Sequence, residues 1–228
     1  MLIIFDLDDT LIDTSGCITY FRLEDALQAM VSHGLIVADF SEALALLRRL
    51  NSTADCARSA IAEFVEILGV DKNFYELAIK EIHKDLPPDW PIFPLEGALD
   101  LLADLGSQHQ LALVTIGRHP FQMEKMKKAG IDSRIFSKIV VTEEKNKKPH
   151  YQMIVEELGY CPTEVLVCGD RIPLDLAPAR ELGFKTVKVQ WGRGLNSSPH
   201  RGEVDYCIFR LKELKGIVYQ LMAPTLKI

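Results

Sequence analysis

The stretch Leu2-Ile3-Ile4-Phe5-Asp6-Leu7-Asp8-Asp9-Thr10 decides how this chain folds. Four consecutive apolar residues that lead directly into acids are typical of a strand in a parallel sheet, buried on both faces and ending in polar groups. Comparable apolar runs return later in the chain, at residues 110–115, 138–142, 164–169, 185–189 and 205–209. The N-terminal stretch is therefore predicted to be one strand of a larger sheet.

Helical patterns lie between the later apolar runs. Four of them stop at a glycine, which is the usual residue after the last turn of a helix. They cover residues 98–105, 120–129, 150–158 and 174–182. Strands that alternate with helices of about 10–15 residues indicate βαβ units, so we expect an α/β fold with a doubly wound parallel sheet.

The segment from residue 16 to residue 90 breaks this alternation. It contains four helical patterns in succession, with no strand between them, at residues 21–31, 41–50, 53–68 and 71–84. Four prolines between Pro87 and Pro94 then predict a stiff connector rather than a helix. We therefore expect two domains, which are a discontinuous α/β core of residues 1–15 and 91–228 and an inserted all-helical domain of residues 16–90.

The composition excludes several classes of protein. The 228 residues include 26 Lys and Arg against 32 Asp and Glu, so the net charge of −6 offers no basic excess for binding a nucleic acid. No apolar stretch approaches the ~18 residues of a membrane-spanning helix, and no secretory signal is recognisable. The five cysteines form no CxxC pair, which indicates reduced thiols. We expect a soluble, cytoplasmic protein that binds neither nucleic acid nor membrane.

Polar residues stand where the predicted strands end. The C-terminal ends of parallel strands meet at one edge of a sheet, and ligands bind there. A charged run that ends in Lys147-Lys148-Pro149 begins a predicted helix near the same edge. The residues at the strand ends are Asp6, Asp8, Thr115, Ile116 and Asp170, with Asp175 five positions after the last of these.

These residue types suit phosphoryl transfer. Asp6 and Asp8 are two positions apart, so on an extended strand they would share a face and address one reacting centre. One carboxylate can attack phosphorus, while the other protonates the leaving oxygen and then activates water. Mg²⁺ would offset the repulsion between these carboxylates and a phosphate, with Asp170 as a further ligand. A lysine and the Thr115 hydroxyl would stabilise the charge that develops on the phosphoryl group.

The chain resembles the haloacid dehalogenase-like (HAD) hydrolase superfamily over nearly its whole length. The four motifs of that superfamily occur in order. They are D-x-D-x-T at Asp6–Thr10, a strand-ending Thr at Thr115, a Lys before Pro at Lys148, and G-D-x-x-x-x-D at Gly169–Asp175. The resemblance implies a phosphatase with a Rossmann-like core and a mobile helical cap that closes over the site and selects the substrate. The acid at Asp8 argues against a dehalogenase, because dehalogenases of the superfamily lack it.

The resemblance also implies roles for the acids. Asp6 would be the nucleophile that becomes an aspartyl-phosphate, and Asp8 would be the general acid and base. Mg²⁺ would be held by Asp6, the main-chain carbonyl of Asp8, and Asp170. Asp175 would orient a metal-bound water or the phosphate-binding lysine.

The phosphate itself would be bound by Thr115, Ile116 and Lys148, with Thr10 in a supporting position. The choice of Lys148 over Lys147 depends only on the Lys-Pro pattern of the superfamily. The remaining lysines of that charged run are expected to stay in water.

Two alternatives to a phosphatase of small metabolites remain at this point. A phosphomutase has the same motifs and differs in what attacks the intermediate. A non-catalytic protein that binds a phosphorylated ligand could keep the fold, although the complete set of acids argues against it. The substrate stays open among sugar phosphates, phosphoglycolate and nucleotide monophosphates, because the helical segment carries no recognisable determinant.

Overall fold

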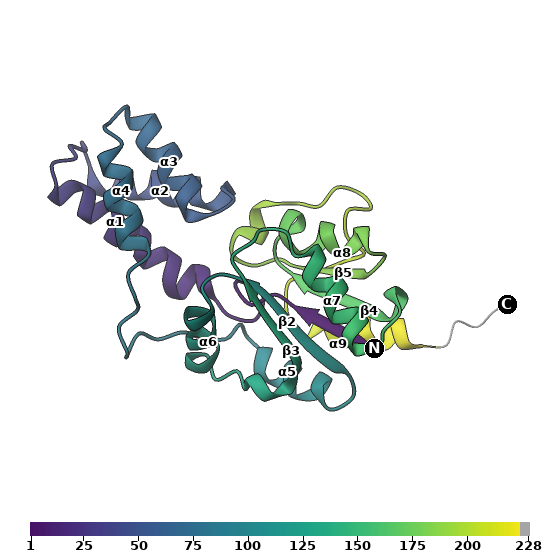
Figure 1. Ribbon diagram of the computed structural model, residues 1–228. Coiled ribbons are helices and arrows are strands. Elements are labelled where there is room, and N and C mark those ends of the chain that lie inside the picture. Colours follow the sequence, from purple (N-terminus) through teal and green to yellow (C-terminus); the bar gives the residue numbers. More distant parts are fainter. Residues whose placement is uncertain (224–228) are drawn as a thin grey trace. The chain divides into compact units, whose positions relative to one another are not determined.

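Six parallel strands form the sheet of the computed structural model, which describes residues 1–223 (Figure 1). The strands are β1 (Leu2–Phe5), β2 (Gln110–Ile116), β3 (Phe136–Thr142), β4 (Val165–Gly169), β5 (Lys185–Val189) and β6 (Tyr206–Ile208). Their order, β3-β2-β1-β4-β5-β6, places β1 inside the sheet between β2 and β4. The predicted α/β fold with a doubly wound parallel sheet is thus confirmed.

The residues of β1 explain its inner position. All four of its side chains are fully buried, as expected for an apolar strand that is covered on both faces. Phe5 pairs with Leu113 on β2 and with Cys168 on β4. The main-chain N–H of Asp6 then donates to the carbonyl oxygen of Cys168 at 3.0 Å. The residues that follow β1, β2 and β4 therefore leave the sheet at the same edge.

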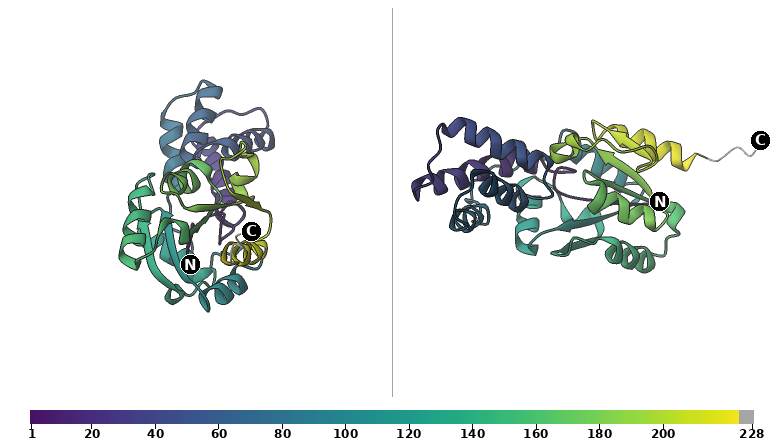
Figure 2. Two further views of the ribbon diagram at one scale, coloured as in Figure 1. Left: turned by 90° about the vertical axis from the view of Figure 1, so that its right-hand side faces the viewer. Right: turned by 90° about the horizontal axis from the view of Figure 1, so that it is seen from above.

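Helices cover both faces of this sheet (Figure 2). The helices of this part of the chain are α5 (Ala98–Gly106), α6 (His119–Lys128), α7 (Lys148–Leu158), α8 (Ala177–Glu181) and α9 (Glu213–Met222). On one face, Tyr151 and Ile154 of α7 share a hydrophobic cluster with Ile4 and Val167 of the sheet. On the other face, α5 and α9 are joined by an ion pair between Asp104 and Lys215.

The helix that was predicted at residues 174–182 is divided in the structure. A π-helical turn covers Ile172–Leu176, and the α-helix proper begins only at Ala177. Pro178 explains the division, because it has no N–H group to donate to the carbonyl of the residue four positions earlier. The turn contains Asp175, which is buried.

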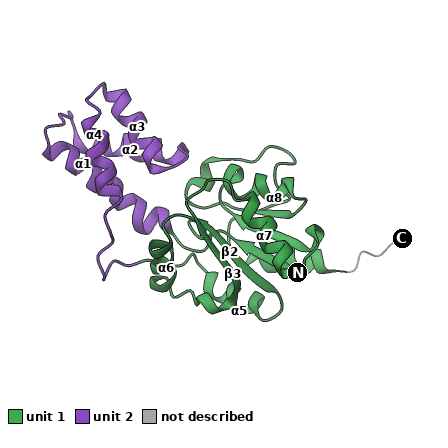
Figure 3. Cartoon of the chain, in the orientation of Figure 1, with its two compact units in different colours: residues 1–13, 92–228 green, residues 14–91 purple. Residues whose placement is uncertain are grey.

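The chain divides into two compact units, which are residues 1–13 with 92–228, and residues 14–91 (Figure 3). The second unit, here called the helical unit, contains α1 (Tyr20–Ser32), α2 (Phe40–Thr53), α3 (Ala57–Leu68) and α4 (Asn73–Ile82). It has a hydrophobic core of its own, which includes Leu27, Leu47 and Phe64. The unit boundaries lie within two residues of those drawn from the sequence pattern.

The two ends of the sheet-containing unit that border the helical unit are held together. Ile12 and Pro94 form an antiparallel β-bridge. The N–H of Asp13 donates to the carbonyl of Phe93 at 3.1 Å, and the N–H of Leu95 donates to the carbonyl of Leu11 at 2.9 Å. The chain therefore leaves the core and re-enters it at one place.

None of the helices within residues 1–223 is both long enough and apolar enough to cross a membrane.

Candidate active site

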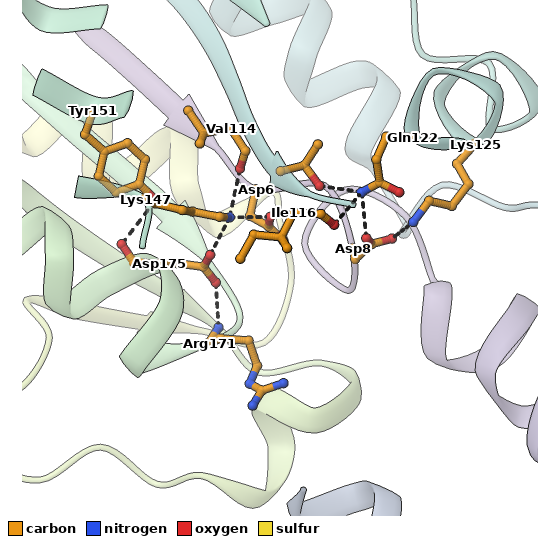
Figure 4. Close-up of polar contacts among 11 residues, drawn as sticks. Asp6, Asp8, Val114, Ile116, Gln122, Lys125, Lys147, Tyr151, Arg171 and Asp175 are labelled. Atoms are coloured by element: carbon orange, nitrogen blue, oxygen red, sulfur yellow. Dashed lines mark hydrogen bonds and ion pairs between the residues drawn. The ribbon is translucent and has the colours of Figure 1, made fainter. Parts of the chain in front are cut away.

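Asp6 lies directly after β1, at the C-terminal edge of the sheet, and is buried. Its Oδ1 atom accepts a hydrogen bond from the Nζ atom of Lys147 at 2.6 Å (Figure 4). The carboxylates of Asp170 and Asp175 are also buried, and one oxygen of each of the three acids lies within 4.8 Å of the others. The predicted convergence of these three acids is therefore present in the structure.

Lys147, not Lys148, is the lysine at this cluster. Its side chain is 1% exposed, and its Nζ atom donates to Asp6 Oδ1 at 2.6 Å, to Asp175 Oδ1 at 2.6 Å and to the carbonyl of Val114 at 2.8 Å. These three contacts use all three ammonium hydrogens, so the side chain is fixed in position.

The expectation that Lys148 reaches the site was wrong by one position. Lys148 is the first residue of α7, and its Nζ atom forms an exposed ion pair with Glu181 Oε2 at 2.7 Å. Successive residues near a helix differ in direction by about 100°, so neighbours cannot both face the acids. The Lys-Pro pattern identified the correct loop but the wrong side chain.

Asp175 is held by hydrogen bonds on both carboxylate oxygens. Oδ1 accepts from Lys147, and Oδ2 accepts from the main-chain N–H of Arg171 at 2.9 Å. The side chain packs against Gly169, where a Cβ atom would lie only 2.6 Å from the Cβ of Asp175. The glycine that ends β4 is thus required for Asp175 to approach the cluster.

Burial controls the electrostatics of this cluster. Desolvation, helped by the charges of Asp175 and Asp8 and opposed by Lys147, raises the pKa of Asp6 from 3.8 to about 7. Burial, together with the charges of Asp175 and Asp6, also holds the pKa of Asp170 well above its usual range. Burial alone would lower the pKa of Lys147, but Asp175 and Asp6 outweigh it and keep the ammonium charged.

The donor set fits a divalent cation. Three buried carboxylates face a single buried ammonium, which leaves an excess of negative charge where desolvation is costly. Because Lys147 and Arg171 already engage both oxygens of Asp175, Asp6 and Asp170 are the carboxylates left for a cation. Mg²⁺ prefers such a set of one or two carboxylates together with further oxygen ligands.

Asp8 lies on the other side of Asp6, and two side chains of α6 hold it (Figure 4). Its Oδ1 atom forms an ion pair with Lys125, and its Oδ2 atom accepts from Gln122 Nε2 at 2.9 Å. Both partners are almost fully buried, whereas the Asp8 side chain is 30% exposed. Sequence reasoning missed both partners. Their spacing of three positions, which puts them on one helix face, was the signal available.

Gln122 also connects Asp8 to the end of β2. Its Nε2 atom donates to the hydroxyl of Thr115 at 2.6 Å and to the carbonyl of Ile116 at 3.2 Å. Thr115 is fully buried beside the acids, in agreement with its expected place at this edge. Thr10 is fully buried too, but its hydroxyl has no hydrogen-bond partner within the described part of the chain.

The comparisons with known proteins agree with this geometry. Residues 3–189 match the family model described as haloacid dehalogenase-like hydrolase. A glyceraldehyde 3-phosphate phosphatase from Methanocaldococcus jannaschii is 29% identical over 96% of this chain and 97% of its own length. A protein with the same name from Pyrococcus furiosus is 25% identical, over 95% of this chain and 92% of its own length.

Solved structures share the fold. A protein from Haemophilus somnus, described as a predicted phosphoglycolate phosphatase, superposes with a TM-score of 0.72 at 18% identity, over 95% of this chain and 96% of its own. A protein from Bacillus subtilis, described as a putative HAD-hydrolase bound to magnesium, gives a TM-score of 0.64 at 19% identity, over 95% of this chain and 97% of its own. The resemblance drawn from the motifs and the expectation of a phosphoric monoester hydrolase are confirmed, and the chain belongs to the haloacid dehalogenase-like hydrolase family.

Proposed function

We propose that this enzyme is a Mg²⁺-dependent phosphatase of small phosphorylated metabolites, and that Asp6 forms an aspartyl-phosphate during turnover. The observation that carries the proposal is the position of Asp6, between the ammonium of Lys147 on one side and the clamped Asp8 on the other. One carboxylate is thereby buried as a nucleophile, while the second stays partly open to substrate and water.

The reaction needs two carboxylates with different roles. Asp6 attacks phosphorus, and the bond from phosphorus to the substrate oxygen breaks as that oxygen takes a proton from protonated Asp8. A water molecule then attacks the phosphorus of the aspartyl-phosphate and gives a proton to Asp8. The bond between Asp6 and phosphorus breaks, inorganic phosphate leaves, and both acids return to their starting states.

Other residues of the chain hold the phosphate and the charge. Mg²⁺, held by Asp6, the main-chain carbonyl of Asp8, and Asp170, would supply positive charge against the phosphate and the nucleophile. Thr115 accepts a hydrogen bond from Gln122, so its own hydroxyl hydrogen stays available for a phosphate oxygen. Lys147 favours the ionised form of Asp6 and fixes its direction, and Asp175 in turn fixes Lys147.

Glyceraldehyde 3-phosphate is the first substrate to test. The curated relatives that bear this substrate in their names match this chain over almost its full length. We propose that the helical unit acts as the cap and selects among monophosphates, since the side chains described above at the sheet edge suit phosphate and metal, which all monophosphates share.

Phosphate release from a panel of monophosphates tests this proposal. The panel contains glyceraldehyde 3-phosphate, phosphoglycolate, hexose phosphates and nucleotide monophosphates, each with Mg²⁺ or with a chelator. We expect release with Mg²⁺, highest for glyceraldehyde 3-phosphate, and none from Asp6→Asn. Asp100→Asn, an exposed acid on α5, is the matched control and should behave as the wild type.

Two results would count against the proposal. Release by the wild type at the level of Asp6→Asn would favour a protein that only binds phosphorylated ligands. Turnover that yields an isomer and needs a bisphosphate would favour a phosphomutase.

A further inference from the structure

We propose that Gln122 and Lys125 are positioning residues for Asp8, and that together they hold its carboxylate where it can serve both the leaving oxygen and the attacking water. The inference rests on the proposed function, because it assigns a task to the general acid and base of that reaction. No sequence motif pointed to either residue.

The buried ammonium of Lys125 is paired with the carboxylate of Asp8. Its side chain is 3% exposed, and its Nζ atom forms an ion pair with Asp8 Oδ1. Burying an ammonium is costly unless a partner compensates it, so a buried lysine at this place requires the Asp8 carboxylate. The aromatic ring of Phe121 lies 5.2 Å from the same Nζ atom and adds a weaker attraction.

Gln122 restrains the second oxygen of Asp8. Its Nε2 atom donates to Asp8 Oδ2 at 2.9 Å, to Thr115 Oγ1 at 2.6 Å and to the carbonyl of Ile116 at 3.2 Å. The loop after β1 is thereby tied to the end of β2. Since a different donor holds each oxygen, the carboxylate can neither rotate about its last bond nor swing away without breaking a charged or buried hydrogen bond.

A fixed carboxylate matters because Asp8 must transfer a proton in both half-reactions. General acid and base catalysis depends on hydrogen-bond reach to the reacting oxygen, and small displacements reduce the rate. The contacts from α6 approach Asp8 from the protein side, and 30% of the side chain stays exposed for the substrate. The two α6 residues therefore act through Asp8 and not on the substrate.

The test compares two leaving groups. A p-nitrophenolate departs with little help from an acid, whereas the alkoxide of glyceraldehyde 3-phosphate needs a proton as it leaves. The value of kcat/KM reports the steps up to departure of the alcohol, so it isolates the acid role of Asp8. We expect Lys125→Met and Gln122→Met to lower kcat/KM for the alkyl phosphate by about 100-fold, within the range for general acid catalysis, and that for p-nitrophenyl phosphate by less than about fivefold.

Two further measurements sharpen the test. Slower attack by water should make the aspartyl-phosphate accumulate in both variants, seen as a burst of p-nitrophenol before the steady state. Lys125→Arg, which keeps a cation, should restore part of the alkyl phosphate activity. Lys127→Met, the same change at an exposed position of the same helix, should alter neither the ratio of the two substrates nor the burst.

Three results would overturn the assignment. An equal loss on both substrates would indicate a general structural defect, and a rise in KM at unchanged kcat would indicate direct contact with the substrate. Unfolding of both methionine variants at room temperature would likewise assign the pair to structure alone. A wild type that releases no phosphate would instead refute the proposed function, so the two failures are distinguishable.

Discussion

The Nζ atom of Lys147 lies 2.6 Å from the Oδ1 atom of Asp6, although 141 positions separate the two residues in the chain. The contact brings the loop before α7 to the end of β1, and Asp175 completes it from the turn before α8. A single ammonium thus links three segments of the sheet edge. Its loss would leave two buried carboxylates facing each other without a cation.

The first prediction separates Lys147 from its neighbour. Lys147→Met should abolish phosphate release and lower the free energy of unfolding by about 3–5 kcal/mol, because a buried pair loses one partner. Lys148→Met removes only an exposed ion pair, and it should cost less than about 1 kcal/mol with activity retained. Urea unfolding and phosphate release measure both. If Lys148→Met abolished phosphate release and Lys147→Met did not, Lys148 would be the lysine of the site, as the Lys-Pro pattern predicted.

A second prediction concerns pH and metal. The pKa of Asp6 is raised from 3.8 to about 7, so between these values the folded protein holds more protons than the unfolded chain. Its stability without metal should therefore fall as pH rises through this window, and the raised pKa of Asp170 adds to the trend. Under the proposed function Mg²⁺ would bind the ionised acids, so the increase in Tm that it causes should be larger at about pH 8 than at about pH 5.5.

Asp170→Asn provides the control for this second prediction. The variant lacks one of the expected ligands, and most of the Mg²⁺-dependent increase in Tm should disappear at either pH. If Mg²⁺ raised the Tm of the wild type and of Asp170→Asn equally, magnesium would be binding at a different site.

A third prediction concerns the glycine after β2. Gly117 has a φ of +154°, and a Cβ atom there would lie 2.9 Å from Cδ of Gln122. Gly117→Ala should therefore displace Gln122, and the ratio of aryl to alkyl phosphate activity should rise as it does for Gln122→Met. Gly159→Ala also replaces a glycine of positive φ, at a position with open space around it, so it controls for backbone strain alone. If both variants change the ratio equally, contact with Gln122 is not the cause.

The fourth prediction concerns a carboxylate far from the chemistry. Asp205 accepts hydrogen bonds from Lys185 Nζ at 2.9 Å and from both the main chain and the hydroxyl of Thr186, and the hydrogen bonds lower its pKa although burial opposes them. Asp205→Asn should lower the free energy of unfolding by about 1 kcal/mol and leave kcat/KM unchanged. The difference should shrink as the pH falls from the ordinary carboxyl value of 3.8 through the lower pKa of the folded acid, because the wild-type carboxylate is then protonated as well. A loss of activity without a loss of stability would contradict this structural role.

Most of the fold was readable from the sequence because the strands are buried on both faces. Such strands are continuous apolar runs, and the polar residue that ends each run must then lie at the sheet edge. Asp6, Thr115 and Asp170 were located by this rule alone. The short helix after Asp175 was not, because the turn before it depends on the place of one proline.

The side chains that reach the site from helices could not be predicted in the same way. Whether Lys147 or Lys148 faces the acids depends on where α7 begins, and a shift of one residue exchanges them. Gln122 and Lys125 belong to a helix whose rotation about its own axis is set by packing against the sheet. A pattern along one chain contains no direct measure of that rotation.

The bridge between Ile12 and Pro94 has a consequence for how this protein can change over time. The exit and the return of the chain are joined to each other by residues of the sheet-containing unit alone, without any contribution from residues 14–91. We therefore expect that a different segment can be inserted between residues 13 and 92 while the strands of the sheet keep their register. With the roles proposed above, the reaction belongs to the sheet-containing unit and the choice of substrate to the insertion, so a new specificity would require no change in the residues that break the phosphate ester.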